Sequence, residues 1–282
     1  MKGFINLIKP ENMSSAYAVT AVKKKFNLPC GHMGTLDPMA SGVLPVGVAK
    51  TSRMFDYLLN KKKIYRAEFT FGYSTDTLDV TGKEESTTNV LPSANEIRAV
   101  LPKFIGQIDQ LPPKYSAKCV DGKRGYQLAR AGVEFTLQPK KVNVLDFRLL
   151  EQTSDKTFSF IIECQGGTYI RSLCRDLALE VGSLGVMSKL ERTASGIFTL
   201  ENGVSVEEFK NSDHPEKYLI APDLAVDFEK LVLTAKQAER LLNGLYDEFD
   251  INDGIYRVYN QNEFWGIGTI KSKKLRMNAY VR

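Results

Sequence analysis

Residues 64–72 read IYRAEFTFG and alternate between apolar and polar side chains. The apolar positions fall at every second residue and are Tyr65, Ala67, Phe69 and Phe71. A period of two is typical of a β-strand that buries one face and leaves the other to solvent. The segment therefore predicts a half-buried strand in an antiparallel sheet.

Further strands and helices are predicted on both sides of this segment, in mixed order. The other predicted strands are at 3–8, 43–48, 142–150, 157–164 and 186–194. The predicted helices begin at residue 14 or 15, at residue 93 and near residue 168. Strands and helices do not follow a regular βαβ repeat, which favours an α+β fold with a mixed, mostly antiparallel sheet.

Three stretches are expected to lack regular structure. Residues 30–42 are rich in glycine, residues 105–133 contain Pro112 and Pro113, and residues 200–228 are polar. The last stretch is read as a linker between domains. Beyond it, a helix capped by Thr234 and three short strands predict a small β-rich module. The expected domains are therefore residues 1–228 and 229–282.

The composition excludes several classes of protein. The 282 residues contain 38 basic and 33 acidic side chains, which gives a formal charge of +5. The last twelve residues hold five Lys or Arg and no acid, a pattern that suits a polyanion as well as an ordinary solvated surface. No apolar run of about 18 residues predicts a membrane helix. The N-terminus does not resemble a secretory signal, so a cytoplasmic protein is expected.

Cysteine and histidine are too few and too scattered for a metal site. The four Cys include no CxxC pair, and the two His, His32 and His214, are far apart in sequence. Zinc ribbons, zinc fingers and HExxH metalloenzymes are therefore disfavoured, and no metal site is predicted. The phosphate-binding patterns GxxxxGK[ST] and GxGxxG are also missing.

The loop sequence GHMGTLDPMASG at 31–42 is the most unusual segment of the chain. It carries His32 and Asp37 among three glycines and a proline, which indicates a tightly shaped loop. Asp37 before Pro38 could be a turn residue only. The alternative is that the loop holds a carboxylate nucleophile or base.

Three other positions have both a structural and a functional interpretation. Arg171 follows Gly166-Gly167 in the first turn of a predicted helix, where the helix dipole disfavours a cation. It is either a surface residue or the partner of an anion. Tyr65 is either a core aromatic or a site residue. Asp79 lies in a polar turn that solvation alone would explain.

Six segments together resemble the bacterial tRNA pseudouridine-55 synthases, the TruB family. They occur in the family's order, and the loop at 31–47 matches its active-site motif. The other segments are LIKPENMSS at 7–15, KIYRAEFTFGYSTDTLDVTG at 63–82, GQIDQLPPKYSAKCVDGKRGYQLARAG at 106–132, GGTYIRSLCRDL at 166–177 and KLERTASG at 189–196. The resemblance spans residues 3–200, and the module beyond about 230 resembles an abbreviated PUA domain.

The resemblance implies a role for each matching residue. Asp37 corresponds to the essential aspartate of pseudouridine synthases, and Arg171 to the arginine that pairs with it. His32 corresponds to a histidine that orders the RNA around a flipped nucleotide. Tyr65 corresponds to the tyrosine that stacks on the target base.

The remaining implied positions line the substrate pocket. Tyr169 and Leu190 match residues around the uracil, and Asp79 matches an aspartate that reaches a rearranged RNA base or sugar. The chain departs from the family at Met33, where a small polar residue is more usual. It departs again at Glu191, where many relatives have arginine.

By this resemblance the chain isomerises uridine 55 in the T loop of tRNA. The reaction changes no oxidation state, so the family uses no cofactor. The resemblance also favours a monomer that binds the tRNA T stem-loop and needs no membrane and no obligate protein partner.

Two alternatives remain. A non-catalytic RNA-binding or RNA-folding protein on the same scaffold would be expected to lose Asp37. An RNA-guided synthase that works in a protein complex usually has longer terminal extensions.

Overall fold

The computed structural model describes residues 1–59, 61–116, 119–120, 122–133, 135–245 and 247–282. The chain forms two compact units, and each is discontinuous in sequence. The first contains Met1–Asp37, Val43–Leu59 and Gly196–Arg282, and the second contains Pro38–Gly42 and Asn60–Ser195. The chain first passes from one unit to the other between Asp37 and Pro38.

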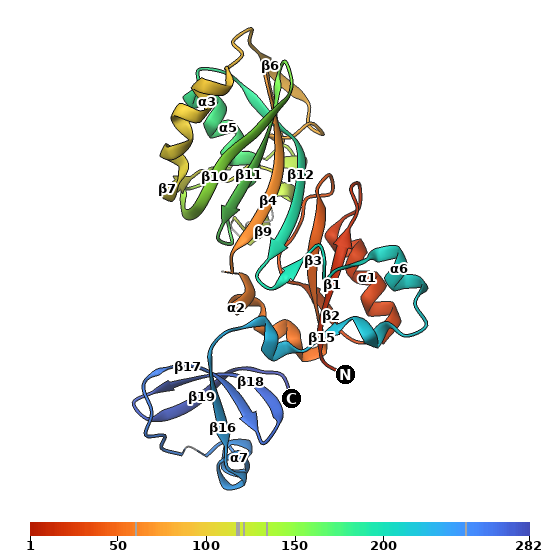
Figure 1. Ribbon diagram of the computed structural model, residues 1–282, viewed down its shortest axis with the longest axis vertical. Helices are drawn as coiled ribbons and strands as arrows, with labels where there is room; N and C mark the ends of the chain where they lie inside the picture. The colour runs from red at the N-terminus through yellow and green to blue at the C-terminus, as the bar shows by residue number, and fades with distance from the viewer. Residues whose placement is uncertain (60, 117–118, 121, 134, 246) are drawn as a thin grey trace. The chain divides into compact units, whose positions relative to one another are not determined.

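A long antiparallel sheet forms the second unit (Figure 1). Strand β4 (Lys63–Phe71) pairs with β12 (Gly185–Ser195) on one side and with β11 (Thr157–Cys164) on the other. The sheet continues through β10 (Lys140–Ser154) to β7 (Gly106–Gln110). The alternation predicted for residues 64–72 is confirmed, because every second residue of β4 is buried.

Aromatic side chains fill the core of this unit. Phe69 of β4 packs on Phe160 of β11 with ring centroids 4.7 Å apart, and Phe147 of β10 lies 5.4 Å from Phe160. Helices α3 (Ala94–Val100) and α5 (Ile170–Glu180) contact each other and the sheet. The predicted cap of α3 is confirmed, since Ser93 and Glu96 form a reciprocal capping box. The helix then continues as the 3-10 turn η2 (Leu101–Phe104).

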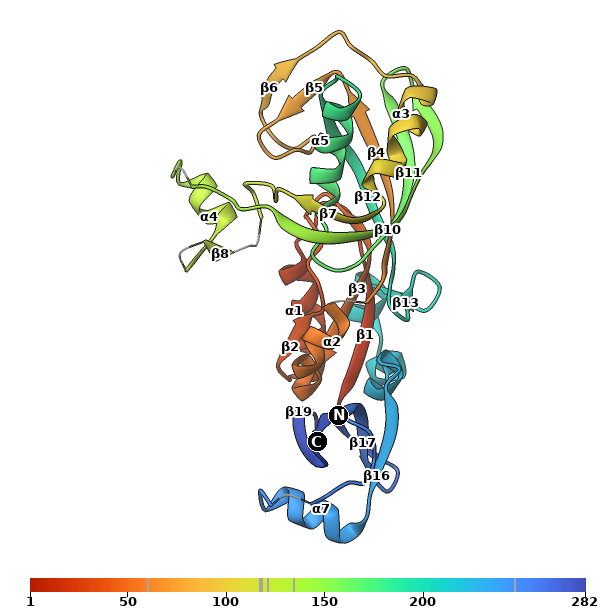
Figure 2. The same cartoon turned by 90° about the vertical axis from the view of Figure 1, so that its left-hand side faces the viewer.

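The expectation that residues 105–133 are irregular is wrong in part. Strand β7 occupies the start of this stretch, and its exposed Gln107 and Asp109 gave no apolar strand signal. Further along, β8 (Cys119–Val120) pairs with β9 (Lys123–Arg124), followed by α4 (Gly125–Arg130). Figure 2 shows α4 projecting beyond the ends of β7 and β10. Residues 117–118 and 121 lie outside the described residues. A separate hairpin pairs β5 (Tyr73–Thr75) with β6 (Glu84–Thr87).

The first unit begins with β1 (Gly3–Lys9) and α1 (Ser15–Phe26), as the sequence predicts. The expectation of a loop over residues 30–42 is wrong at both ends, because β2 (Cys30–His32) pairs with β3 (Ser41–Val48). Gly31 lies directly opposite Gly47 in this hairpin. The chain continues into η1 (Ala49–Met54) and α2 (Phe55–Leu59).

Residues 200–228 fold onto β1 and are not a linker. Short strands β14 (Val204–Ser205) and β15 (Leu219–Ile220) both pair with β1, and α6 (Val206–Asn211) packs on α1 through Phe209 and Phe26. The stretch also holds η3 (Pro215–Tyr218) and η4 (Pro222–Ala225), and it follows β13 (Phe198–Thr199). Its buried apolar residues are too widely spaced to give a periodic pattern.

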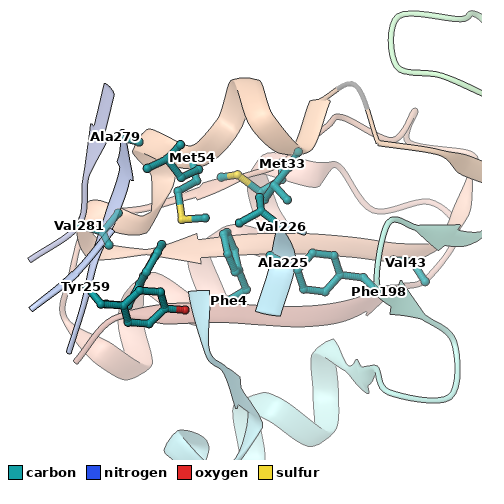
Figure 3. Close-up of a cluster of buried hydrophobic side chains, with 13 residues drawn as sticks. Phe4, Met33, Val43, Met54, Phe198, Ala225, Val226, Tyr259, Ala279 and Val281 are labelled. Atoms are coloured by element: carbon teal, nitrogen blue, oxygen red, sulfur yellow. The ribbon is translucent and has the colours of Figure 1, made fainter. Parts of the chain in front are cut away.

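The C-terminal sheet also belongs to the first unit. The three predicted strands are confirmed as β17 (Gly254–Asn260), β18 (Glu263–Lys271) and β19 (Lys274–Tyr280), and β16 (Glu229–Leu233) adds a fourth. Thr234 caps α7 (Ala235–Leu242) as expected. Figure 3 shows a shared apolar cluster in which Tyr259 and Val281 lie beside Phe4 and Met54. The C-terminal strands are therefore packed on N-terminal elements.

The predicted fold class is confirmed: an α+β protein with a mostly antiparallel sheet and a small β-rich C-terminal part. The predicted domain boundary at residues 228 and 229 stays a prediction. The compact units divide elsewhere, because residues 196–282 share their core with the N-terminal segments.

Candidate active site

The loop that carries Asp37 lies between β2 and β3, and its residues up to Asp37 belong to the first unit. His32 ends β2 opposite Val46 and is half-buried. The next residue, Met33, donates its backbone N–H to the Pro45 carbonyl at 2.7 Å, and its side chain enters the apolar cluster of Figure 3. The unusual methionine at this position is therefore a core residue of this unit.

Asp37 itself is half-buried and follows a buried leucine. The hydroxyl of Ser15, the first residue of α1, bonds to both backbone polar groups of Leu36. Ser15 was not identified from the sequence. The available signal was a pair of adjacent serines at a helix start, where only one is needed as the cap.

Tyr65 and Leu190 share a face of the sheet in the second unit. On the antiparallel pair β4 and β12, Tyr65 lies opposite Arg192 and Ala67 opposite Leu190. Directly opposed residues point to the same side, as do residues two apart on one strand. Both side chains are buried, which agrees with the core interpretation of Tyr65 and leaves its stacking role a prediction.

Arg171 and Asp79 form a buried ion pair in the same unit. Nη1 of Arg171 lies 3.6 Å from Oδ2 of Asp79, and the two side chains are 5% and 6% exposed. This excludes a surface role for Arg171 and simple solvation for Asp79. The sequence did not predict this pair. The pairing of Arg171 with Asp37 stays a prediction.

Backbone and hydroxyl groups complete the surroundings of this ion pair. Arg171 donates from Nη1 to the Thr77 carbonyl at 2.8 Å and from Nη2 to the Tyr115 carbonyl at 3.0 Å. Oδ1 of Asp79 accepts bonds from the Thr77 hydroxyl and from the backbone and hydroxyl of Thr81. Such charge-assisted bonds fix both groups and reduce the cost of burying them.

Tyr169 immediately precedes α5 and is held through its backbone. Its N–H donates to Oε1 of Gln110 at 2.8 Å, and its carbonyl accepts from Nε2 of Gln110 at 3.1 Å. Gln110 is buried at the end of β7. No local sequence pattern indicates this contact, because the two residues are 59 positions apart.

Two buried cations lie on neighbouring strands of the second unit. Lys63 of β4 and Arg192 of β12 are 4% and 1% exposed. Burial, followed by the charge of Arg192, lowers the pKa of Lys63 to about 8. Gly42 pairs with Arg192 and has φ +102°, and a Cβ there would lie 2.2 Å from the Arg192 carbonyl oxygen. Only glycine fits this close approach.

The described residues contain neither a candidate metal site nor a candidate membrane-spanning helix. They contain no group of three His, Cys, Asp or Glu side chains placed to hold a metal ion. Among the same residues, no helix is long and apolar enough to cross a membrane.

Comparison with known proteins gives consistent matches over the whole chain. The model of the TruB family pseudouridylate synthase N-terminal domain matches residues 22–170. The chain is 37% identical to tRNA pseudouridine synthase B of Alkaliphilus oremlandii (strain OhILAs), over 97% of this chain and 94% of that protein. It is also 37% identical to the protein of the same name from Clostridium novyi (strain NT), over 100% of both chains.

A solved structure supports the fold independently. The chain superposes on one described as a Cbf5-Nop10-Gar1 complex with a TM-score of 0.73 at 24% identity, over 98% of this chain and 83% of that chain. The family match covers more than half of the chain, and the relatives match along its full length. The chain therefore belongs to the TruB family of pseudouridylate synthases, with the bacterial enzymes among its close relatives.

Proposed function

We propose that this enzyme isomerises uridine to pseudouridine at position 55 in the T loop of tRNA. The observation that carries the proposal is the complete Asp37 loop in a chain 37% identical to tRNA pseudouridine synthase B proteins along its length. A non-catalytic relative would have no need to keep this carboxylate in its full motif.

The reaction rearranges bonds within one nucleotide. The bond between C1′ and N1 breaks, the uracil turns, and a bond forms between C1′ and C5. The proton on C5 leaves and N1 gains one, so atoms and charge balance without an oxidant, a reductant or a cofactor. Asp37 acts either by attacking the sugar or base or by removing a sugar proton.

The target base has to leave the RNA stack before any of these steps, which costs a few kcal/mol of stacking energy. Tyr65 then offers a ring face to the extruded base. Leu190 shares the face of the sheet on which Tyr65 lies, and with Tyr169 it forms the apolar part of the uracil pocket. His32 orders the RNA around the flipped nucleotide.

Arg171 and Asp79 form the polar side of the pocket. Arg171 stabilises the charge of Asp37, and Asp79 reaches a rearranged RNA base or sugar. Their burial and the bonds that Arg171 donates to the Thr77 and Tyr115 carbonyls support a fixed arrangement that is set before substrate arrives. The enzyme acts as a cytoplasmic monomer on the tRNA T stem-loop, without an obligate protein partner.

The decisive experiment uses an unmodified tRNA transcript labelled with tritium at C5 of uridine. Isomerisation releases the C5 hydrogen to water, so one equivalent of tritium per tRNA is expected. Replacing uridine 55 with cytidine should abolish the release. Release that persists in the cytidine transcript would disprove the position, and no release from either transcript would disprove the activity.

Asp37→Asn tests the catalytic residue within this proposal. The change keeps the size of the side chain and removes the charge, so tritium release should fall by at least about a thousandfold. Binding of tRNA, measured by filter retention, should remain. Turnover near the wild-type rate would remove Asp37 from the chemistry.

A further inference from the structure

Ser15 makes an unusual double contact with the loop that bears Asp37. It is the first residue of α1 and is only 3% exposed. Its hydroxyl donates to the Leu36 carbonyl at 2.9 Å and accepts the Leu36 N–H at 2.9 Å. One side chain therefore satisfies both backbone polar groups of a buried residue.

Leu36 directly precedes Asp37 in the chain. Its side chain is 3% exposed, so the residue is held by core packing as well as by its backbone. Consecutive Cα atoms are about 3.8 Å apart, and few dihedral angles separate the Leu36 carbonyl from the Asp37 side chain. Fixing Leu36 thus fixes the point from which the carboxylate extends.

The turn that precedes Ser15 is held in place by hydrogen bonds. The side chain of Lys9 is fully buried, and its ammonium donates to the carbonyls of Pro10 and Met13 at 2.7 Å each. These bonds brace the turn between β1 and α1. The loop is also fixed at its start, where Met33 bonds to Pro45.

Helix capping does not account for the Ser15 hydroxyl. The cap of α1 is Ser14, whose hydroxyl accepts the N–H of Tyr17 at 3.2 Å. Ser14 is exposed, and its hydroxyl bonds to a backbone group of the helix. The hydroxyl of Ser15 bonds instead to the loop that carries Asp37. The two adjacent serines thus divide helix capping and loop attachment between them.

We propose that Ser15 is a positioning residue for the catalytic carboxylate. By holding Leu36 at both of its backbone groups, it sets the place and direction of Asp37 for the isomerisation. The inference rests on the proposed function, in which Asp37 performs the chemistry.

The test compares Ser15→Ala with Ser14→Ala on tritium-labelled tRNA. Single-turnover rates are measured with enzyme in excess, at a temperature where circular dichroism shows every variant to be folded. Ser15→Ala should be roughly 10- to 100-fold slower, because small displacements of a reacting group have large effects on rate. Its dissociation constant for tRNA should stay within about twofold of wild type, since RNA binding does not depend on the exact carboxylate position. Ser14→Ala should melt at a lower temperature and keep the wild-type rate.

The outcomes separate this inference from the proposed function. A wild-type enzyme that releases no tritium contradicts the proposed function itself. If wild type is active and Ser15→Ala reacts at the same rate, or if Ser14→Ala slows equally, the positioning role is wrong.

Ser15→Thr provides a rescue variant, because it keeps the hydroxyl and adds a methyl group. It should react faster than Ser15→Ala although both change the packing at this site. If Ser15→Ala does not fold at any temperature, Ser15→Cys replaces it as the weakly bonding variant. A threonine variant no faster than the alanine or cysteine variant would contradict the inference.

Discussion

At the scale of single residues, Arg171 depends on geometry as much as on charge. Its guanidinium reaches the Thr77 and Tyr115 carbonyls and Asp79 with two nitrogens. Lysine keeps the charge but has one flexible nitrogen, so it does not reproduce this planar set of bonds.

Arg171→Lys should therefore reduce both stability and activity. Leaving a buried carbonyl without its donor costs about 1–3 kcal/mol of unfolding free energy. We also expect the single-turnover rate on tRNA to fall about tenfold or more, because the group no longer holds its partners in place. Arg175→Lys, one turn further along α5 and more exposed, is the control. Equal effects of both changes on melting temperature and rate would show that Arg171 has no special role.

Lys63 should make the folded protein more stable as the pH rises above about 8. Its pKa is about 8 in the folded protein, against an ordinary value of 10.5, because burial and the nearby Arg192 disfavour its charge. Below pH 8 the group is charged in both states, and folding bears the full cost of burying it. Between pH 8 and 10.5 only the unfolded chain still binds the proton, so raising the pH favours the folded state.

Lys63→Met removes this titration. Its unfolding free energy relative to wild type should therefore decline by about 2 kcal/mol between pH 7.5 and 10. Urea denaturation at several pH values measures the change, and Lys62→Met, an exposed neighbour, controls for the loss of a lysine from this segment. A stability difference that does not vary with pH would contradict the lowered pKa.

At the scale of elements, the start of α5 is attached to the end of β7. Gln110 bonds to both backbone groups of Tyr169, and the next carbonyl, that of Leu111, accepts the Ser172 hydroxyl at 2.8 Å. The helix start carries Tyr169 and Arg171, so this attachment orients two residues of the proposed pocket.

Gln110→Ala should weaken the attachment of the helix start to the strand. It leaves both backbone groups of Tyr169 without Gln110, and we expect a loss of about 1–3 kcal/mol in unfolding free energy. Gln107→Ala changes an exposed glutamine of the same strand and should have little effect. Urea denaturation compares the two, and an equal loss would mean that strand propensity, and not the contact with Tyr169, accounts for the result.

At the scale of the whole molecule, the C-terminal strands contribute to the core of the first unit. Tyr259, Ile267 and Val281 belong to the same apolar cluster as Phe4 and Met54. Deleting residues 229–282 would expose that cluster, so a deletion would change RNA affinity and stability together. Charge substitution on the exposed face is the cleaner test of RNA binding.

Replacing Lys271, Lys274 and Arg276 with glutamine should weaken tRNA binding and leave the single-turnover rate at saturating enzyme unchanged. All three are exposed in the described C-terminal part. Each lost phosphate contact should flatten the log–log salt dependence of binding by about one unit. Glutamine at Lys83, Lys103 and Lys156, in the second unit, makes the same change in net charge. Equal effects of both triple variants would show that net charge, and not this face, governs binding.

Much of the fold could be predicted because its signals are local. The burial alternation of β4 has a period of two, and the capping box joins Ser93 and Glu96, which are only three positions apart. The errors arose where apolar residues are sparse. Strand β7 exposes polar side chains, and residues 200–228 bury isolated apolar residues between short elements.

The sequence by itself determined the α+β class, the central strands and the residues that carry the proposed chemistry. Only the tertiary structure revealed what holds them: Thr77 and Tyr115 with Arg171, Gln110 with Tyr169, and Ser15 with Leu36. These partners are 94, 56, 59 and 21 residues apart in sequence. Each of these contacts joins a side chain to a backbone group, and every residue possesses backbone groups. No side-chain pattern marks such a partner, so only the folded chain identifies it.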